Sequence, residues 1–561
     1  MKKLNKRYKF SICMLLATVA VTGCKKGLDL IAKDTLTEVS FWKTPADFKL
    51  AANAFYSMLP GFGYEDMEAD IAFSTPNTLS NGQLQKTDES DVWNNAYVQI
   101  RSANVAIEKA SSTTDEAIKR YMAEVKFFRA YNYWKLVHIF GGVPLIDKVY
   151  QPLDPGLFVS RSSQQETVEF ILKDLDEAIP NLPLKSQLPA EDIGRITKGT
   201  ALALKARVSL FEGTWEKFRN QASASKYLDQ AIVASNEIMS SNEYALYTGS
   251  GEQSYRYLFI EQGDDSPESI LDHRYQRNIS GHSAPYLYDR VGYLPTKALA
   301  DLYLDNTGLP ISKSGVFQGY GTFTSEFAHR DPRMTMTMIV PGTETVRVFH
   351  PSIPVANWPD FPQRNLNTGY ILYKYMSEDA FANNSGEGGA YGGAHDFDRH
   401  IIRYAEVLLI YAEAVYEKNG TITDADLDLS VNLLRDRAGM PHLTNAFVMT
   451  NNLNMREEIR RERTVELALE GFRRDDLTRW KTAETVLPED VKGIKIKGSE
   501  WENRPPYNVA GYQSRVDGNG FLIVESSRTF DPGKNYLQPI PTKEIAFYTQ
   551  SGFTLEQNPG W

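Results

Sequence analysis

The side chains that could do chemistry are few, and their spacing does not favour catalysis. His395 and His400 are close in sequence, but no H-E-x-x-H motif contains them, so a zinc site is not expected. The acidic run DADLD at 424–428 begins like a calcium loop, yet it lacks glycine at the sixth position and has Arg435, not glutamate, at the twelfth. We expect this run to cap the following helix. The GGAYGG segment at 388–393 neither follows a strand nor opens a helix, so it is not expected to cradle phosphate.

Carboxylates are numerous, and counting them does not decide whether two could hydrolyse a glycosidic bond. Only their separation in space decides that. A surface glycan hydrolase therefore stays one alternative, and a helical adaptor without a ligand stays another. The sequence as a whole predicts no catalytic residue, no cofactor and no metal ion.

Binding chemistry is better represented, because aromatic residues recur in segments rich in glycine, proline and asparagine. An exposed ring can stack on the apolar face of a sugar, while amide, carboxylate or guanidinium groups bond its hydroxyls. Trp358, between Asn357 and Pro359, is the leading candidate because these neighbours predict a rigid polar turn. The other expected ligand-binding residues are Phe62, Tyr64, Phe73, Asn77, Asn81, Tyr286, Tyr288, Asp289 and Tyr293. Each aromatic ring taken singly is also consistent with core packing.

A charged stretch at 454–480 is expected to position much of the chain. It predicts one long helix capped by Asn454, with an apolar face. That face consists of Val465, Ala468, Leu469 and Phe472. Glutamates recur every four residues, at Glu458, Glu462, Glu466 and Glu470, among several arginines. The charge pattern alone favours a solvated helix with three pairs across one turn, Glu458–Arg461, Arg463–Glu466 and Glu470–Arg473. Within a chain of helices, our hypothesis is a buried guanidinium–carboxylate clamp that joins the helical scaffold to the C-terminal tail.

Helical periodicity dominates the two ends of this 561-residue chain, and it weakens in the middle. Helices are predicted at 47–58, 91–110, 115–140, 166–179, 197–211, 222–239, 296–305, 400–418 and 427–438. Short turns between most of them argue for stacked αα-hairpins. The strand-like runs at 334–341 and 370–376 belong to a loop-rich part. The expected division is a helical scaffold at 46–243, a loop-rich ligand-facing region at 244–400, and C-terminal helices with a tail at 401–561.

The N-terminus has the order of a targeting segment. Lysines and an arginine within 2–9 precede an apolar run at 10–21 that is too short to span a bilayer. The run closes on V-T-G-C, which resembles the lipobox of bacterial lipoproteins. Residues 1–23 are therefore predicted to be a lipoprotein signal peptide, with Cys24 as the acylated, palmitate-bearing first residue of a tether at 24–45. A plain signal peptide with a chance cysteine is the alternative.

The cysteine count and the net charge limit the covalent links and the binding partners that this protein could have. Cys13 would leave with the signal, so Cys24 is the one cysteine left and no disulfide is expected. Removal of residues 1–23 takes five positive and no negative charges, which changes the formal net charge from −10 to −15. Such a surface repels nucleic acid, so we expect no nucleic-acid partner. We therefore expect lipid chains, and not basic residues, to anchor the protein to the membrane.

Several motifs run in order along nearly the whole chain. They are FWKTPADFKLAANAFY at 41–56, AEVKFFRAYNYWKLVHIFGGVPL at 123–145, GRITKGTALALKARVSLFEG at 194–213, HRDPRM at 329–334, TGYILYK at 368–374, IIRYAEVLLIYAEAVYEKNG at 401–420, EGFRRDDLTRW at 470–480, YLQPIPTKEI at 536–545 and QNPGW at 557–561. Together they resemble the SusD/RagB family of surface lipoproteins. Two departures stand out: Arg474 and Asp475 replace positions that are often aromatic, and Lys25 and Lys26 follow the cysteine where acidic residues are common.

The resemblance implies a mainly α fold in which tetratricopeptide-like helical hairpins hold a large loop-rich ligand face. It implies a binding protein without catalysis that captures oligosaccharide, polysaccharide or another nutrient. It also implies a TonB-dependent, SusC-like outer-membrane transporter as the partner, and a lipid-anchored, surface-exposed position on the outer membrane.

Overall fold

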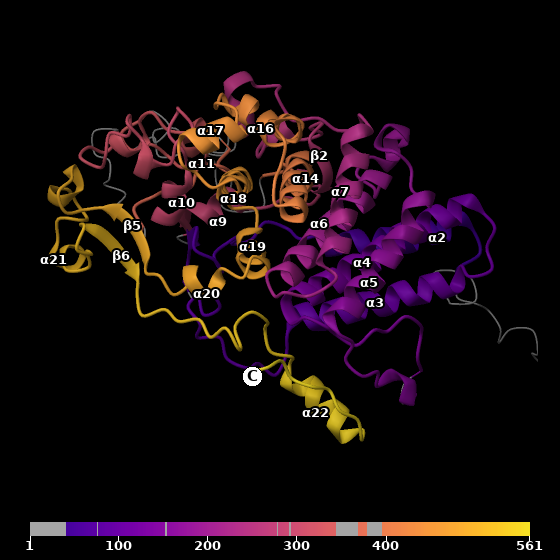
Figure 1. Ribbon diagram of the computed structural model, residues 1–561. Helices are drawn as coiled ribbons and strands as arrows, with labels where there is room; N and C mark the ends of the chain where they lie inside the picture. The colour runs from indigo at the N-terminus through magenta and orange to yellow at the C-terminus, as the bar shows by residue number, and fades with distance from the viewer. Residues whose placement is uncertain are drawn as a thin grey trace, which may run out of the picture.

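The computed structural model describes residues 41–75, 77–151, 154–277, 279–290, 293–343, 368–377 and 395–561 (Figure 1). In helix α9 the side chains of Tyr286, Asp289 and Arg290 lie outside this description. The described chain is mainly helical, with three two-stranded sheets. None of its helices is long and apolar enough to cross a membrane.

The first half of the chain forms packed helical pairs, as the periodicity predicts. Its helices are α2 (Pro45–Asn53), α3 (Asp91–Lys109), α4 (Glu116–Phe140), α5 (Gln164–Ala178), α6 (Lys198–Lys217) and α7 (Ala224–Ser240). Each of α3, α4 and α6 packs against the helix that follows it, and α7 also packs against α14 (Tyr404–Asn419). The expected mainly α fold of stacked hairpins is confirmed.

Local sequence fixes where these helices begin and end. The Asp115 carboxylate accepts from the backbone N–H of Ala117 at 2.9 Å and opens α4. Gly141 ends this helix with φ +73°, and a Cβ there would come within 2.9 Å of the Leu537 side chain. Between these ends, Val125 and Leu136 are fully buried in the main apolar core.

The middle of the chain has short elements joined by loops. They are α8 (Ser254–Tyr257), β2 (Ser269–His273), α9 (Ala284–Arg290), β3 (Leu294–Pro295), α10 (Lys297–Leu302) and α11 (Pro332–Thr337). Strand β1 (Ala72–Phe73) pairs antiparallel with β3, and β2 pairs antiparallel with β4 (Arg399–Arg403). These pairings tie the loop region to both helical ends.

The prediction of a strand-like run at 334–341 is wrong over its first half. Asp331 accepts from the backbone N–H of Arg333 at 2.9 Å, and Pro332 occupies the first helical position, so the chain starts α11. An isolated bridge between Met338 and Leu372 is what remains of the expected strands.

The C-terminal part consists of short helices and one ribbon. It contains α15 (Asp424–Asp428), α16 (Val431–Ala438), α17 (Asn445–Thr450), α18 (Met455–Glu466), α19 (Arg473–Arg479), α20 (Ala483–Val486), β5 (Val491–Lys495), α21 (Ala510–Gln513), β6 (Phe521–Glu525) and α22 (Thr542–Gln550). Contrary to the sequence prediction, the DADLD run does not cap the next helix but forms the short helix α15 itself. Thr423 caps this helix, and the Asp426 carboxylate accepts from the Thr423 hydroxyl at 2.6 Å.

The prediction of one long helix at 454–480 is wrong, although Asn454 does cap its start. The helix breaks between α18 and α19, where Leu469 has φ +65° and Gly471 has φ +91°. Only glycine adopts such angles readily, so this turn is held by other contacts. The backbone N–H groups of Gly471 and Arg473 both donate to Asp66, which pulls the chain out of helical register.

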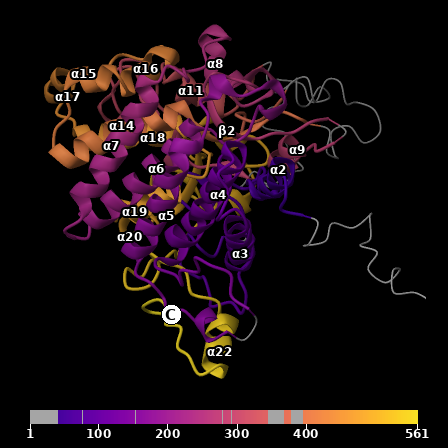
Figure 2. The same cartoon turned by 90° about the vertical axis from the view of Figure 1, so that its right-hand side faces the viewer.

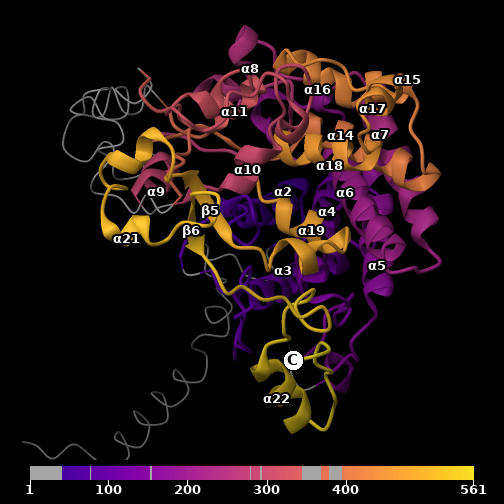
Figure 3. The same ribbon diagram turned by 60° about the vertical axis from the view of Figure 1, so that its left-hand side comes forward.

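The three views agree on the arrangement of these parts. In Figure 1 the N-terminal helices lie on one side, the β5–β6 ribbon lies at the other, and α14, α18 and α19 stand between them. Figures 2 and 3 show that α22 projects from the lower end of the molecule, beside the C-terminus.

Candidate functional site

A network of buried charges fixes the loops of the middle region to α18. The Glu466 carboxylate is fully buried, and it accepts from Arg333 of α11 at 2.9 Å, from Arg403 of β4 at 2.7 Å and from Arg437 of α16. Burial alone would raise the pKa of Glu466, but the three guanidinium groups hold it well below its usual value. One carboxylate thus joins three separate elements.

The neighbouring glutamates extend this network. Glu462 meets Arg333 at 2.7 Å and Arg435 at 2.9 Å, while Glu470 meets Arg403 and Lys374 at 2.8 and 2.6 Å. The expected buried lattice is therefore present, and the solvated alternative is excluded for these residues. We call Glu462, Glu466, Glu470 and their cationic partners the ionic cluster.

Two details of the predicted clamp need correction. Among the expected pairs across one turn, Glu458 with Arg461 forms at 3.3 Å, whereas Arg463 turns to Asp476 at 2.8 Å and Arg473 turns to Asp70 at 2.8 Å. The break after α18 places Arg473 on a separate helix from Glu470, whereas Arg463 and Glu466 share α18 but each pairs with residues of other elements.

The ionic cluster does not hold the C-terminal tail as the hypothesis states. It joins α18 to α11, β4 and α16 instead. The tail is held outside the ionic cluster. Arg474 of α19 donates to the Asn535 carbonyl at 3.1 Å, so residues 454–480 do reach the tail, and the Asn558 amide donates to the carbonyls of Phe140 at 2.9 Å and Gln538 at 2.6 Å.

Aromatic rings form a continuous layer above the ionic cluster, and Tyr375 donates to the Leu469 carbonyl there at 2.9 Å. The layer consists of Tyr275, Phe62, Tyr375, Tyr288, Tyr293 and Tyr64, in spatial order. Successive ring centroids lie 5.9, 5.8, 5.5, 5.2 and 5.9 Å apart. We call these six residues the aromatic layer. Four of its members were predicted from the sequence to bind ligand.

The aromatic layer is buried in the middle and accessible at its two ends. Tyr288 is 2% exposed and Tyr293 is fully buried, so their prediction as exposed stacking rings is wrong. They lie under their neighbours because α9 and β3 turn both phenols inward. Phe62, Tyr64 and Tyr275 are only partly buried. These three rings are the members of the layer able to meet a ligand.

Tyr275 was not among the ligand-binding residues predicted from the sequence. It follows β2 directly and stands in the run RYQR, between Arg274 and Arg277. An aromatic residue flanked by cations just after a strand is the pattern that could have identified it. Its ring stacks on His273, with centroids 4.5 Å apart and planes within 10°.

Three other predicted residues have structural roles. Phe73 is 4% exposed in the β1–β3 pair. The Asn77 amide donates to the Met67 carbonyl at 2.7 Å, and the Asn81 amide donates to Glu525 at 3.1 Å. Both asparagines are buried, and their amides are used within the fold: Asn77 ties its own loop together, and Asn81 links that loop to β6. Their amides therefore have structural partners in this conformation, and their role as ligand contacts stays a prediction.

The remaining predicted site residues cannot be placed. Trp358 falls within 344–367, and Cys24 falls within 1–40, both outside the described residues. The side chains of Tyr286 and Asp289 are also outside the description. Their roles in ligand binding and lipidation stay predictions.

Polar groups surround the accessible end of the layer at Tyr275. Arg274 pairs with Asp265 at 3.0 Å and Arg277 pairs with Asp396 at 3.1 Å, and both arginines keep at least 40% of their side chains exposed. Guanidinium groups of this kind can bond sugar hydroxyls beside a ring. Exposed ring edges and exposed donors therefore meet on one surface.

The histidines near this surface do not form a metal site. The Nε2–H of His282 donates to the Phe397 carbonyl at 3.1 Å, and its Nδ1 accepts from the backbone N–H of Ala284 at 3.1 Å. Burial lowers the pKa of His282 to about 3 and that of His395 to about 4, so both rings are neutral at pH 7. His400 instead pairs with Asp272 at 2.7 Å. Within the described ranges no group of three or more potential ligands could hold a metal ion.

Two known protein families match separate parts of this chain. The model described as "SusD family" matches residues 257–561, which is more than half of the chain. The chain belongs to the SusD family. A second family model, described as "Starch-binding associating with outer membrane", matches residues 56–210. The family expected from the sequence motifs is thus confirmed.

Relatives and solved structures of this family match this chain over most of its length. SusD-like protein P38 of Formosa agariphila is 26% identical over 87% of this chain and 94% of its own. The starch-binding protein SusD of Bacteroides thetaiotaomicron is 22% identical over 68% of each chain. A SusD-like carbohydrate-binding protein of Bacteroides fragilis superposes with a TM-score of 0.73 at 26% identity, covering 90% of this chain and 98% of its own.

Proposed function

We propose that this SusD-family protein is a non-catalytic glycan receptor that captures oligosaccharide or polysaccharide through the accessible ends of the aromatic layer. Sugar rings would stack on Phe62, Tyr64 and Tyr275, while Arg274 and Arg277 bond the hydroxyls. The observation that carries this proposal is the end of the layer at Tyr275, where a half-buried ring lies between the exposed guanidinium groups of Arg274 and Arg277 in the chain. Trp358 would add a further ring.

The cellular setting is part of the same proposal. Cys24 would carry the lipid that anchors the chain to the outer membrane, with its body exposed at the cell surface. A SusC-like TonB-dependent transporter would accept the captured glycan. The family match and the carbohydrate-binding names of relatives support this setting.

The test is binding of a polysaccharide panel to the mature chain by affinity electrophoresis and calorimetry. A shallow, wet site predicts a Kd of roughly micromolar to millimolar. Replacing Tyr275 by alanine should weaken binding by about 5- to 100-fold, because stacking of one aromatic ring is worth about 1–3 kcal/mol. Product analysis over time should detect no cleavage.

Tyr150→Ala is the matched control, since Tyr150 is also partly buried but belongs to a loop beside α3. It should leave affinity unchanged. Binding that survives both Tyr275→Ala and Tyr64→Ala would remove the aromatic layer from the proposal. Turnover of any glycan would replace the receptor by a hydrolase.

A further inference from the structure

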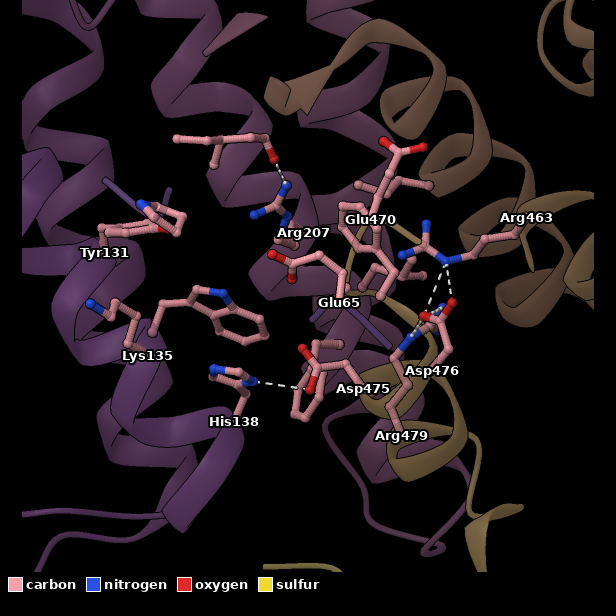
Figure 4. A pocket seen from close by; sticks show the side chains of 18 of the residues that line it. Glu65, Tyr131, Lys135, His138, Arg207, Arg463, Glu470, Asp475, Asp476 and Arg479 are labelled. Carbon is pink, nitrogen blue, oxygen red and sulfur yellow. Dashed lines mark hydrogen bonds and ion pairs between the residues drawn. The ribbon is translucent and has the colours of Figure 1, made fainter. Parts of the chain in front are cut away.

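A cavity lies between the helices α4 and α6 and the turn that joins α18 to α19. It occupies about 260 Å³, more than the ~150 Å³ of a cavity that accommodates benzene. Figure 4 shows its walls, which come from α4 and α6 on one side and from the turn between α18 and α19 on the other. Glu65 and Arg399 line it as an ion pair at 2.7 Å. Arg399 also donates to the carbonyl of Gly61, the residue before Phe62, so this pair adjoins both sites.

One wall of the cavity is aromatic. Trp134 stacks on His138 with centroids 4.8 Å apart and planes within 17°, and it meets Phe211 edge-on at 5.1 Å. Tyr131 and Phe472 line the same space. Rings arranged in this way suit the C–H face of a small ring compound.

Most charges around the cavity are already satisfied. Arg207 pairs with Glu406 at 2.7 Å, and Arg479 pairs with Glu413 at 2.5 Å. Asp475 meets His138 at 3.0 Å, on the side of the imidazole turned away from Lys135 in Figure 4. These groups have no charge left to attract a ligand strongly.

Two cationic side chains keep a nitrogen without a partner among the described residues, although Arg463 also pairs with Asp476 through its Nε at 2.8 Å. Lys135, on α4, is half-buried and has no ion-pair or hydrogen-bond partner among the described residues. Arg463, on α18, is 3% exposed, and its Nη1 has no hydrogen-bond partner in the described part of the chain. Figure 4 shows Lys135 on the α4 side of the cavity, with its amine directed outward, and Arg463 on the opposite side, with its terminal nitrogens turned toward the centre. Burial lowers the pKa of the Lys135 amine, which marks the cost of an unpaired cation there.

We propose that this cavity binds a monosaccharide-sized sugar acid, whose carboxylate pairs with Lys135 and whose ring hydroxyls accept from Arg463. An anion supplies the partner that Lys135 lacks, and the sugar ring covers the wall formed by Trp134 and Tyr131. A bare inorganic anion would leave that wall without a contact. The inference goes beyond the proposed function, because the site uses other residues and binds a single acidic unit.

Calorimetric titration of the mature chain with D-glucuronate tests the proposal, with D-glucose as the neutral counterpart of the same ring. Glucuronate should bind with one-to-one stoichiometry, and glucose should bind at least about 10-fold more weakly, because a charge-assisted hydrogen bond is lost. Lys135→Gln should weaken glucuronate binding by a similar factor, and Lys135→Arg should restore most of it. Lys119→Gln, at an exposed position of the same helix, should have no effect.

Three results would overturn the inference. They are absence of glucuronate binding by the wild-type chain, equal affinity in Lys135→Gln, and equal affinity for sulfate, which would indicate an inorganic-anion site. Unchanged thermal melting of Lys135→Gln shows that the variant is folded. Tyr275→Ala should leave glucuronate binding intact, so failure of polysaccharide binding at the aromatic layer would be recognised separately.

Discussion

The N-terminal helices and the region around α18 are both buried, but by opposite kinds of side chain. Val125, Leu136 and Leu204 are fully buried among other apolar groups in the core of the helical pairs. Around α18, the positions of equal burial are Glu466, Arg333 and Arg403. One region is held by non-directional apolar contact, and the other by directed ionic hydrogen bonds.

The difference matters for what each region does. The stabilisation from apolar packing is proportional to the area removed from water, and an apolar core tolerates substitutions that keep its volume. A buried ion pair adds little net stability compared with apolar residues, but removal of one partner is costly because it leaves a charge without compensation. We infer that the ionic cluster specifies where α11, β4 and α16 sit, and with them the aromatic layer.

Glu466→Ala should produce the largest loss of stability. It leaves Arg333, Arg403 and Arg437 without a shared carboxylate, and breaking a buried pair costs about 3–5 kcal/mol. The free energy of unfolding, measured in denaturant, should fall by that amount, while the glycan affinity of the remaining folded protein changes much less.

Glu457→Ala is the control on the same helix, since its carboxylate is 59% exposed and its nearest cation, Arg460, is 3.8 Å away. Its effect should stay within about 0.5 kcal/mol. If Glu466→Ala costs no more than Glu457→Ala, the ionic cluster is not what holds this region. A selective loss of glycan affinity would instead make Glu466 part of the binding site.

Leu136→Ala should have the next largest effect, about 2–5 kcal/mol, because it opens a cavity in the apolar core. Leu50→Ala, at a position that is 51% exposed on α2, provides the same chemical change without a cavity. Conservative changes sharpen the comparison between the regions. Leu136→Met keeps the volume and should cost less than about 1.5 kcal/mol, whereas Glu466→Gln keeps the shape, loses the charge and should remain more costly.

The limits of the N-terminal helices could be predicted from the sequence, because the spacing of apolar residues and the capping residues agree there. Asp115, Gly141 and the apolar spacing of α4 are all local, so the predicted limits of 115–140 differ from the observed helix by one residue. The break after Glu466 depends on Asp66, about 400 residues away, whose carboxylate binds the N–H groups of Gly471 and Arg473. No local pattern at 454–480 carries that contact.

The site was predictable in composition but not in exposure. Phe62, Tyr64, Tyr288 and Tyr293 were selected as loop aromatics, and they do share one layer. Which rings face solvent depends on what packs over them, and only Phe62 and Tyr64 remain accessible. Tyr275 was missed because a single tyrosine after a strand has no periodic signature. The tertiary contact with Phe62 gives it its place.

The last prediction concerns how the stability of the protein depends on pH. His400 lies beside the ionic cluster, where burial alone would lower its pKa, but the Asp272 carboxylate at 2.7 Å outweighs burial and raises the pKa to about 9. Since the unfolded imidazole has a pKa near 6.5, the folded state holds an extra proton between these values. This contribution to stability is complete below about pH 6.5 and is lost as pH rises toward 9. Denaturant unfolding should show wild-type stability exceeding that of His400→Gln by about 3 kcal/mol more at pH 6 than at pH 9.5. Leu136→Ala, which removes no titrating group, should lower stability by the same amount at both pH values. A pH-independent difference between wild type and His400→Gln would show that the imidazole is neutral in the fold and that its pairing with Asp272 is an ordinary hydrogen bond.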